Sequence, residues 1–344
     1  MRILVVKLTS MGDVLHLMPA LSDLCAAKSD VVIDWMIEDS FADIPTWHPN
    51  VDRVIAVSTR RWRRPTWTNI KEFFRFVKNL RSTRYDVIVD AQGLMKSAVF
   101  SRLAKRNKGG YYAGYSGDSI KESPAAWLYN KKTPVAREQH AIKRLRLLFA
   151  DCFHYSFDAK SLDYGANIKK AEAKSSARTH KPTIMLLHGT TWPSKHLPDT
   201  LWRDLADLIA DDGYKIKICW GNEQERQRAE WIAKERPSVS VLDNSTLNTL
   251  AEELAQISGA IAVDTGLGHM AAAFAIPCVT VYGSTNATLT GTMGENQTHL
   301  LSDYPCSPCL LKKCDKLTEQ VTLPPCYQHL DAATIWQTLH TQIV

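Results

Sequence analysis

The most suggestive local pattern lies near the start of the sequence, where a short apolar run ends in Lys7-Leu-Thr-Ser-Met-Gly-Asp13. A carboxylate at the end of a strand and the start of a helix can accept the proton of an incoming hydroxyl as a general base. Ser10 or Asp13 can equally cap the helix, as often happens in such loops. Asp13 is therefore a candidate catalytic base, with helix capping as the alternative.

Two later segments have the composition of phosphate-binding loops. The first, residues 188–196, carries hydroxyls at Thr190 and Thr191 and a point charge at Lys195 that suits a diphosphate. The second, Asp264-Thr-Gly-Leu-Gly-His269, has small residues that let backbone amides approach a phosphate at a helix N-terminus. An exposed loop lysine, a tight turn without ligand and a core histidine are the plain alternatives.

Acidic residues follow Trp220-Gly221, at the predicted end of another strand. Glu223 or Glu225 could hydrogen-bond a ribose, and Glu225 is the preferred candidate. The alternative is a negatively charged first helical turn, which the helix dipole favours.

A basic block, Arg60-Arg-Trp-Arg-Arg64, offers four guanidinium groups for carboxylates or phosphates. It lies in a half of the chain, residues 1–150, that holds 25 Lys and Arg against 14 Asp and Glu, whereas the rest holds 17 against 22. The first half is therefore expected to face an anion, which could be a nucleic acid, a membrane surface or an acidic substrate. A solvated charge run is the alternative, and no nucleic-acid-binding motif accompanies the block.

Four cysteines gather late in the sequence, at Cys306, Cys309, Cys314 and Cys326. The Cys-x-x-Cys pair could belong to a structural zinc site, but the spacing fits no standard ribbon or finger, and reduced thiols are the preferred interpretation. The other four cysteines are predicted to be buried thiols.

Two α/β alternations are expected to position these residues. Short buried strands alternate with helices in each half, which predicts two doubly wound parallel sheets, the first with strands at 2–7, 31–37, 54–57 and 87–89 and helices at 14–27, 70–81 and 97–104. The second has strands predicted at 183–188, 215–220, 239–242, 260–263 and 278–282, with helices near 198–211, 223–235, 247–257 and 268–275.

The predicted domain plan has four parts. Residues 1–158 form an N-terminal Rossmann-like domain, 159–181 a connection rich in Lys, Ala and Ser, and 182–328 a C-terminal Rossmann-like domain. Residues 329–344 form a closing helix that could pack back on the first domain. Two such sheets bind ligands beyond their strand ends, which predicts a donor and an acceptor at a central cleft. The sequence has no long apolar run and no signal-like start, so a cytoplasmic location is expected.

Together these motifs resemble family 9 glycosyltransferases, the lipopolysaccharide heptosyltransferases, and within them the heptosyltransferase I group. The resemblance runs almost end to end. It rests on residues 10–16, the Arg block, Asp90-Ala-Gln-Gly-Leu94 with Lys96-Ser97, Gln139-His140, the Thr-Thr…Lys-His segment at 190–196, Trp220-Gly221 and Asp264-Thr-Gly-Leu267.

The resemblance implies a GT-B fold and transfer of L-glycero-D-manno-heptose from ADP-heptose to the Kdo sugar of lipid A precursors, with inversion and without metal or other cofactor. It makes Asp13 the base and Lys195 the group that stabilises the leaving diphosphate. The implied donor-binding residues are Thr190, Thr191, Lys195, Glu225, Asp264, Thr265, Gly266, Leu267 and His269. The implied acceptor-binding residues are Ser10, Met11, Gly12, Arg60, Arg61, Arg63, Arg64, Lys121 and His140.

The implied partners are ADP-heptose, Kdo-lipid A and the anionic inner-membrane surface, with no nucleic acid. The sequence departs from the heptosyltransferase I pattern in its cysteine-rich tail, which is more typical of heptosyltransferase II, and at Lys121, where relatives carry arginine. Transfer to a first heptose, as by a heptosyltransferase II, is therefore an alternative. From other classes, a nucleotide-sugar epimerase or a non-enzymatic polyanion binder also remains open.

Overall fold

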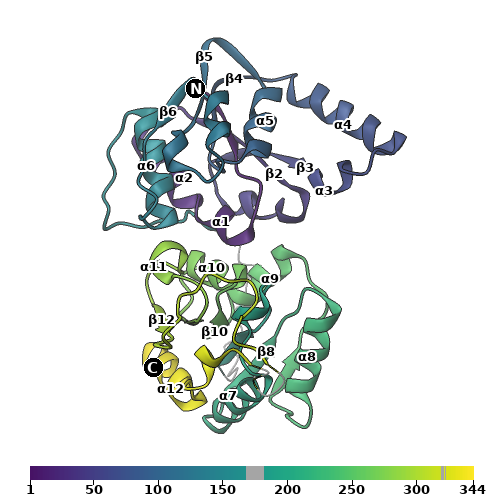
Figure 1. The fold of residues 1–344 in the computed structure, drawn as a ribbon, viewed down its shortest axis with the longest axis vertical. Coiled ribbons are helices and arrows are strands. Elements are labelled where there is room, and N and C mark those ends of the chain that lie inside the picture. Colours follow the sequence, from purple (N-terminus) through teal and green to yellow (C-terminus); the bar gives the residue numbers. More distant parts are fainter. Residues whose placement is uncertain (168–181, 319–320, 322) are drawn as a thin grey trace, which may run out of the picture. The chain divides into compact units, whose positions relative to one another are not determined.

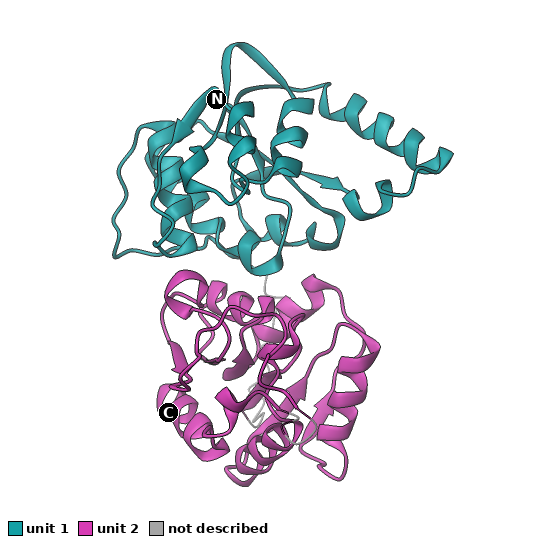
Figure 2. Cartoon of the chain, in the orientation of Figure 1, with its two compact units in different colours: residues 1–167 teal, residues 168–344 magenta. Residues whose placement is uncertain are grey.

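The computed structural model describes residues 1–167, 182–318, 321 and 323–344. The chain divides into two compact units, Met1–Asn167 and Ile168–Val344 (Figure 2). Unit 1 extends past the predicted boundary at 158, and the Asn167 amide donates to the carbonyl of Trp47 at 2.9 Å. The rest of the predicted connection, residues 168–181, lies outside the described residues.

Unit 1 contains a six-stranded sheet in the order β3-β2-β1-β4-β5-β6, with every neighbouring pair parallel (Figure 1). This is the order of a doubly wound Rossmann-like sheet, which confirms the predicted fold class for this half. The strands are β1 (Arg2–Val6), β2 (Val32–Glu38), β3 (Val51–Val57), β4 (Arg84–Asp90), β5 (Lys105–Tyr115) and β6 (Lys131–Thr133).

One helix predicted in unit 1 is divided in the structure. The helix expected over 14–27 is two helices, because Pro19 lies in the first turn of the second and has no N–H to continue the first. The helices are α1 (Met11–Leu15), α2 (Met18–Ala27), α3 (Thr59–Trp62), α4 (Trp67–Leu80), α5 (Met95–Leu103) and α6 (Ala141–Phe153), with short 3₁₀ turns η1 (Asp39–Phe41), η2 (Ile44–Trp47), η3 (Gly117–Ser119) and η4 (Ser123–Leu128).

The sequence patterns did not predict β5, β6 or α6. Strand β5 begins Lys-Arg-Asn-Lys-Gly-Gly and has no apolar run in its first half, so only its pairing with β4 defines it. A residue-by-residue apolar pattern is a weak signal for a strand whose stability comes from its neighbours.

Unit 2 repeats the architecture with the order β12-β11-β10-β7-β8-β9, again parallel throughout. Its strands are β7 (Thr183–Leu187), β8 (Lys215–Ile218), β9 (Val239–Val241), β10 (Gly259–Val263), β11 (Cys278–Tyr282) and β12 (Gln297–Leu301). Its helices are α7 (Asp199–Asp211), α8 (Glu223–Ala233), α9 (Leu247–Leu254), α10 (Gly266–Ala273), α11 (Ala287–Thr290) and α12 (Ala332–Ile343), with 3₁₀ turns η5 (Pro193–Lys195) and η6 (Pro325–Tyr327).

The closing helix α12 packs on its own unit, and its predicted packing against the first domain stays a prediction. It contacts α7, β10 and β11, and it buries Ile335, Trp336 and Leu339 in the core of unit 2. The indole N–H of Trp336 also donates to Asp212 at 2.5 Å. This apolar stripe is already covered within unit 2.

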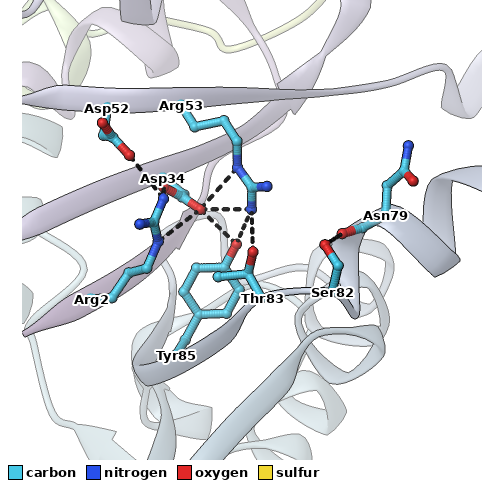
Figure 3. A network of polar contacts seen from close by, with 8 residues as sticks. All are labelled: Arg2, Asp34, Asp52, Arg53, Asn79, Ser82, Thr83 and Tyr85. Atoms are coloured by element: carbon cyan, nitrogen blue, oxygen red, sulfur yellow. Dashed lines mark hydrogen bonds and ion pairs between the residues drawn. The ribbon is translucent and has the colours of Figure 1, made fainter.

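A buried carboxylate ties four strands of unit 1 together (Figure 3). Asp34 on β2 is fully buried and forms ion pairs at 2.7 Å with Arg2 of β1 and Arg53 of β3. It also accepts the hydroxyl of Tyr85 on β4 at 2.7 Å, and burial followed by the contact with Asp34 raises the pKa of that phenol. The network sets the register of β1, from which the loop of Asp13 continues.

We expect Asp34→Ala to destabilise unit 1 by about 3–5 kcal/mol, because it leaves the partners of a buried ion pair uncompensated. The matched control is Asp52→Ala, which removes the exposed second partner of Arg2 and should cost no more than about 1 kcal/mol. Native-state hydrogen exchange of the β1 and β2 amides measures both. Equal effects of the two substitutions would contradict this role of Asp34.

Candidate functional site

The candidate acceptor pocket of unit 1 lies where the strand order of the sheet reverses, beyond the carboxyl ends of β1 and β4. In a doubly wound sheet the loops of these two strands diverge and leave a crevice for ligands. The pocket has a volume of about 210 Å³. It is lined by Lys7, Asp13, Ala91, Gln92, Gly93, Leu94, Tyr115, Ser119, Ile120, Lys121, Arg137, Ala141, Arg144 and Leu145.

Asp13 lines this pocket from the first turn of α1. Its Oδ2 accepts the backbone N–H of Ser10 at 3.0 Å and the Ser10 hydroxyl at 2.8 Å. The two interpretations of Asp13 are therefore compatible, since the carboxylate caps the helix start and also borders the pocket. Both hydrogen bonds are made by Oδ2, and they also fix the orientation of the second carboxylate oxygen, Oδ1.

The loop after β4 is organised by a second carboxylate, Asp90. It is fully buried and accepts from the hydroxyls of Tyr129 at 2.6 Å and Ser97 at 2.8 Å, and from the amides of Gln92 and Gly93. Burial raises its pKa, and these hydrogen bonds oppose that shift. The side chain of Gln92 in turn accepts the amides of Leu8 and Thr9, so the two loops that border the pocket are joined.

Four basic residues line the pocket together with Asp13: Lys7, Lys121, Arg137 and Arg144. Lys7 is buried, and its pKa is lowered mainly by that burial, although Asp13 and Asp90 oppose the effect. The Arg144 guanidinium donates to the carbonyl of Ser119 and lies 5.2 Å above the Tyr115 ring. This arrangement suits a ligand that carries both a hydroxyl for Asp13 and an acidic group for the cations.

Of the predicted acceptor residues, Asp13's neighbours Ser10, Met11 and Gly12 shape the loop without lining the pocket, and only Lys121 lines it. His140 caps α6 by accepting the Ile142 amide at 3.2 Å. Sequence reasoning missed Lys7, Arg137 and Arg144 as site residues. Lys7 gave one usable signal, a charge directly after an apolar strand, whereas the two arginines are brought in only by the fold.

The Arg block lies elsewhere on unit 1, on α3 and the turn after it, and none of its four arginines lines the Asp13 pocket. Arg61 is held by Glu72 of α4 and by the Ser58 hydroxyl, and it borders a separate pocket of about 490 Å³. Arg60, Arg63 and Arg64 are exposed. The predicted role of the block in acceptor binding stays a prediction, and any such contact would lie outside the Asp13 pocket.

In unit 2 the predicted donor residues meet at the equivalent reversal, beyond β7 and β10. The Lys195 ammonium forms an ion pair with Asp264 at 2.7 Å and lies 4.7 Å above the Trp192 ring. Asp264 also accepts the Thr285 hydroxyl at 2.6 Å, and the Thr190 hydroxyl donates to the Asp264 carbonyl at 3.2 Å. The two predicted loops are thus brought together, with Lys195 held by a carboxylate.

Helix α10 begins immediately after Asp264, with Thr265 at its N-cap position and Gly266 and Leu267 in its first turn. The Thr265 side chain does not cap the helix, and the first N–H groups of a helix have no acceptor within it. These groups and the helix dipole favour an anion beside Lys195. His269 is buried on the same helix, and Thr191 is exposed on the neighbouring loop.

Glu225 lies close to the loop after β7, although it comes from α8. Its carboxylate accepts the Gly221 amide at 2.8 Å, and a Cβ atom at Gly189 would lie only 2.8 Å from it. Gly189 is thus required for this close approach. Nearby, His188 is buried with its ring edge-on to Trp202, and burial lowers the pKa of His188 to about 3.

Comparison with known proteins decides the family. The model of glycosyltransferase family 9 (heptosyltransferase) matches residues 73–318. The chain belongs to this family. Lipopolysaccharide heptosyltransferase 1 of Pseudomonas aeruginosa is 42% identical over 316 residues, which cover 91% of this chain and 87% of the relative.

Two solved structures of Escherichia coli heptosyltransferase WaaC are also similar to this family 9 chain. The complex with ADP has a TM-score of 0.85 at 35% identity and covers 99% of this chain and all of that one. The complex with ADP-2-deoxy-2-fluoro heptose has a TM-score of 0.78 at 39% identity and covers 87% and 93%. The predicted GT-B fold and the resemblance to heptosyltransferase I are confirmed.

The chain is thus a glycosyltransferase, a family 9 enzyme of heptose transfer in lipopolysaccharide core biosynthesis. The non-enzymatic polyanion binder and the epimerase are thereby set aside. No helix in the described ranges combines the length and the apolar character needed to cross a bilayer.

We expect Lys195→Gln to weaken ADP binding about 10- to 100-fold, since a hydrogen bond to a charged group contributes about 1.5–3 kcal/mol. Lys312→Gln is the matched control, because Lys312 lies 5.8 Å from the same Trp192 ring. Isothermal titration calorimetry with ADP measures both variants. An equal loss in the two would assign the effect to general charge and contradict the specific role of Lys195.

Proposed function

We propose that this chain transfers L-glycero-D-manno-heptose from ADP-heptose to the Kdo sugar of a lipid A-linked acceptor, with inversion at the anomeric carbon. The observation that carries the proposal is a carboxylate, Asp13, bordering a pocket lined by four cations at the sheet reversal of unit 1. A Kdo sugar supplies both groups that this pocket can use, a hydroxyl nucleophile and a carboxylate. The relatives named heptosyltransferase 1 support the same assignment.

The donor is held by unit 2. Its diphosphate is bound by Lys195 and by the amides at the start of α10, and Glu225 bonds the ribose. The solved relative with ADP and the one with a fluorinated ADP-heptose support this nucleotide. Trp192 and Asp264 fix the ammonium of Lys195, so little reorganisation is needed when charge develops on the leaving ADP.

The reaction is a single displacement. Asp13 takes the proton of the acceptor hydroxyl as its oxygen bonds to the anomeric carbon, and the bond to ADP breaks with its electron pair on the phosphate. Lys195 and the helix dipole stabilise that charge, which is the part a divalent cation plays in many transferases. No metal or other cofactor is needed in this proposal, and the sequence contains no Asp-x-Asp pair.

The cations of the acceptor pocket have a separate part. Burial disfavours the charged form of Lys7, and an acceptor carboxylate entering the pocket would favour it again. Arg137, Arg144 and Lys121 would complete the recognition of the acidic sugar. The Arg block, outside this pocket, would contact the phosphates of the lipid portion.

The test is Asp13→Asn, which keeps an oxygen to accept the Ser10 amide while removing the basic carboxylate. We expect kcat/KM to fall on the order of 10²- to 10⁴-fold while ADP affinity is unchanged, because Asp13 belongs to unit 1 and the donor residues to unit 2. The product is detected as the mass of one added heptose on Kdo-lipid A. Turnover by the Asp13→Asn variant at the native rate would contradict the proposed mechanism.

Peripheral binding to the cytoplasmic face of the inner membrane is part of the proposal, since the acceptor is a lipid. Helix α4 exposes Trp67 by 80% and Phe74 by 66%, beside the Arg block and its own Lys71, Arg75 and Lys78 (Figure 1). Amphipathic helices with aromatic residues and adjoining basic groups bind anionic membrane surfaces.

We expect Trp67→Ser with Phe74→Ser to lower binding to vesicles containing anionic phospholipid by about tenfold or more, because each buried aromatic side chain contributes about 1.5–3 kcal/mol. Trp127→Ser is the control, since Trp127 is 81% exposed but lies in η4, away from this helix in the sequence. Vesicle co-sedimentation measures binding. Unchanged binding of the double variant would rule out α4 as the contact.

A further inference from the structure

A cysteine cluster in unit 2 has no part in the function described above. Its members Cys306, Cys309, Cys314 and Cys326 line one cavity of about 10 Å³, roughly the space of a single water molecule. All four are free and half-buried.

The tertiary structure brings the four cysteines to one cavity, which their spacing along the chain did not indicate. The Cys-x-x-Cys pair alone is ambiguous, but Cys314 and Cys326 border the same cavity as the pair. The other cysteines of the chain are isolated by comparison, such as Cys219 and Cys278, which are fully buried in unit 2. Four thiols around one small space form the ligand set that a tetrahedral thiolate site requires.

The segment that carries the cluster has little regular structure and little apolar burial among its described residues. Between the end of β12 at Leu301 and the start of η6 at Pro325, the described residues form no helix or strand. Its large apolar side chains point to solvent: Leu310, Leu311, Leu317 and Leu323 are each at least 40% exposed. Segments without a core of their own are commonly held by a metal or by cross-links.

This segment also supports the donor loop. The Ser194 amide donates to the Lys312 carbonyl at 3.2 Å, and the Ser194 hydroxyl donates to the Leu311 carbonyl at 2.6 Å. On the other side, the Tyr327 hydroxyl donates to the Ser194 carbonyl at 2.9 Å. Ser194 precedes Lys195 directly, so whatever fixes the cysteine segment also fixes the backbone from which Lys195 extends.

We propose that the cysteine cluster binds one thiolate-preferring divalent ion of the zinc type, as a structural site that fastens segment 306–326 to the donor loop. Among the described residues no three His, Cys, Asp or Glu side chains are already arranged to hold a metal ion, so the thiols must turn inward on binding. Zinc–sulfur bonds are about 2.3 Å long, which fits a cavity of this size. Binding forms four metal–sulfur bonds and releases the thiol protons to solvent.

Cobalt provides the test, because Co²⁺ bound by thiolates has intense charge-transfer absorption. Titrating the reduced, metal-free full chain with Co²⁺ should give this absorption with the bands of a tetrahedral site, saturating at one equivalent and displaced by Zn²⁺. Cys309→Ser should weaken Co²⁺ binding at least tenfold and alter the spectrum. Cys25→Ser, which changes a half-buried thiol of α2 in unit 1, should alter neither.

Circular dichroism establishes that each variant is folded. A folded, reduced chain without the charge-transfer absorption would overturn the proposal, and so would intact masses showing these cysteines paired as disulfides in the purified protein. That the metal site helps to position Lys195 rests on the proposed donor function and is tested separately. Removing the metal should lower the affinity for ADP several-fold. Unchanged ADP affinity would refute that support, and the cobalt spectrum decides the metal site independently.

Discussion

The chemistry of this protein depends on one feature of parallel sheets, the reversal of strand order that occurs once in each unit. On either side of the reversal the connecting segments lead away in opposite directions, so the loops after the two central strands leave a space between them. In unit 1 these are the loops after β1 and β4, and in unit 2 the loops after β7 and β10. The pocket of Asp13 lies at the first position, and the ion pair of Lys195 with Asp264 at the second.

The two units also share an electrostatic plan. In each unit a lysine lies in the loop after the first strand, Lys7 in unit 1 and Lys195 in unit 2. An aspartate lies at the end of the fourth strand or directly after it, Asp90 in unit 1 and Asp264 in unit 2. The aspartates organise the loops, since Asp90 accepts four hydrogen bonds and Asp264 holds Lys195 directly. A lysine positioned in this way meets an anionic ligand without first having to be ordered.

Distant parts of each unit maintain these loops. The Asp34 network fixes the register of β1, which leads into the loop of Asp13, and Gln92 joins that loop to the one after β4. In unit 2 the cysteine segment and η6 both bond to Ser194, beside Lys195. The exposed aromatic residues of α4 and the Arg block lie outside these loops, and in the proposed function they contact the lipid part of the acceptor.

The sequence alone determined the two parallel sheets, the family, and the loops of Asp13, Lys195 and Asp264, because these loops follow short buried strands whose apolar runs are local signals. It did not predict β5, β6, α3, α6, α11 or β12, nor the split of α1 and α2. It also left open which residues line the pocket of Asp13.

Only the tertiary structure brought Arg137 and Arg144 to Asp13, separated the Arg block from that pocket, and gathered the four cysteines around one cavity. The physical reason is that these arrangements join residues far apart in the chain. Local patterns reflect burial and backbone preference at neighbouring positions, whereas the meeting of distant loops is set by strand order and by packing between helices and sheet.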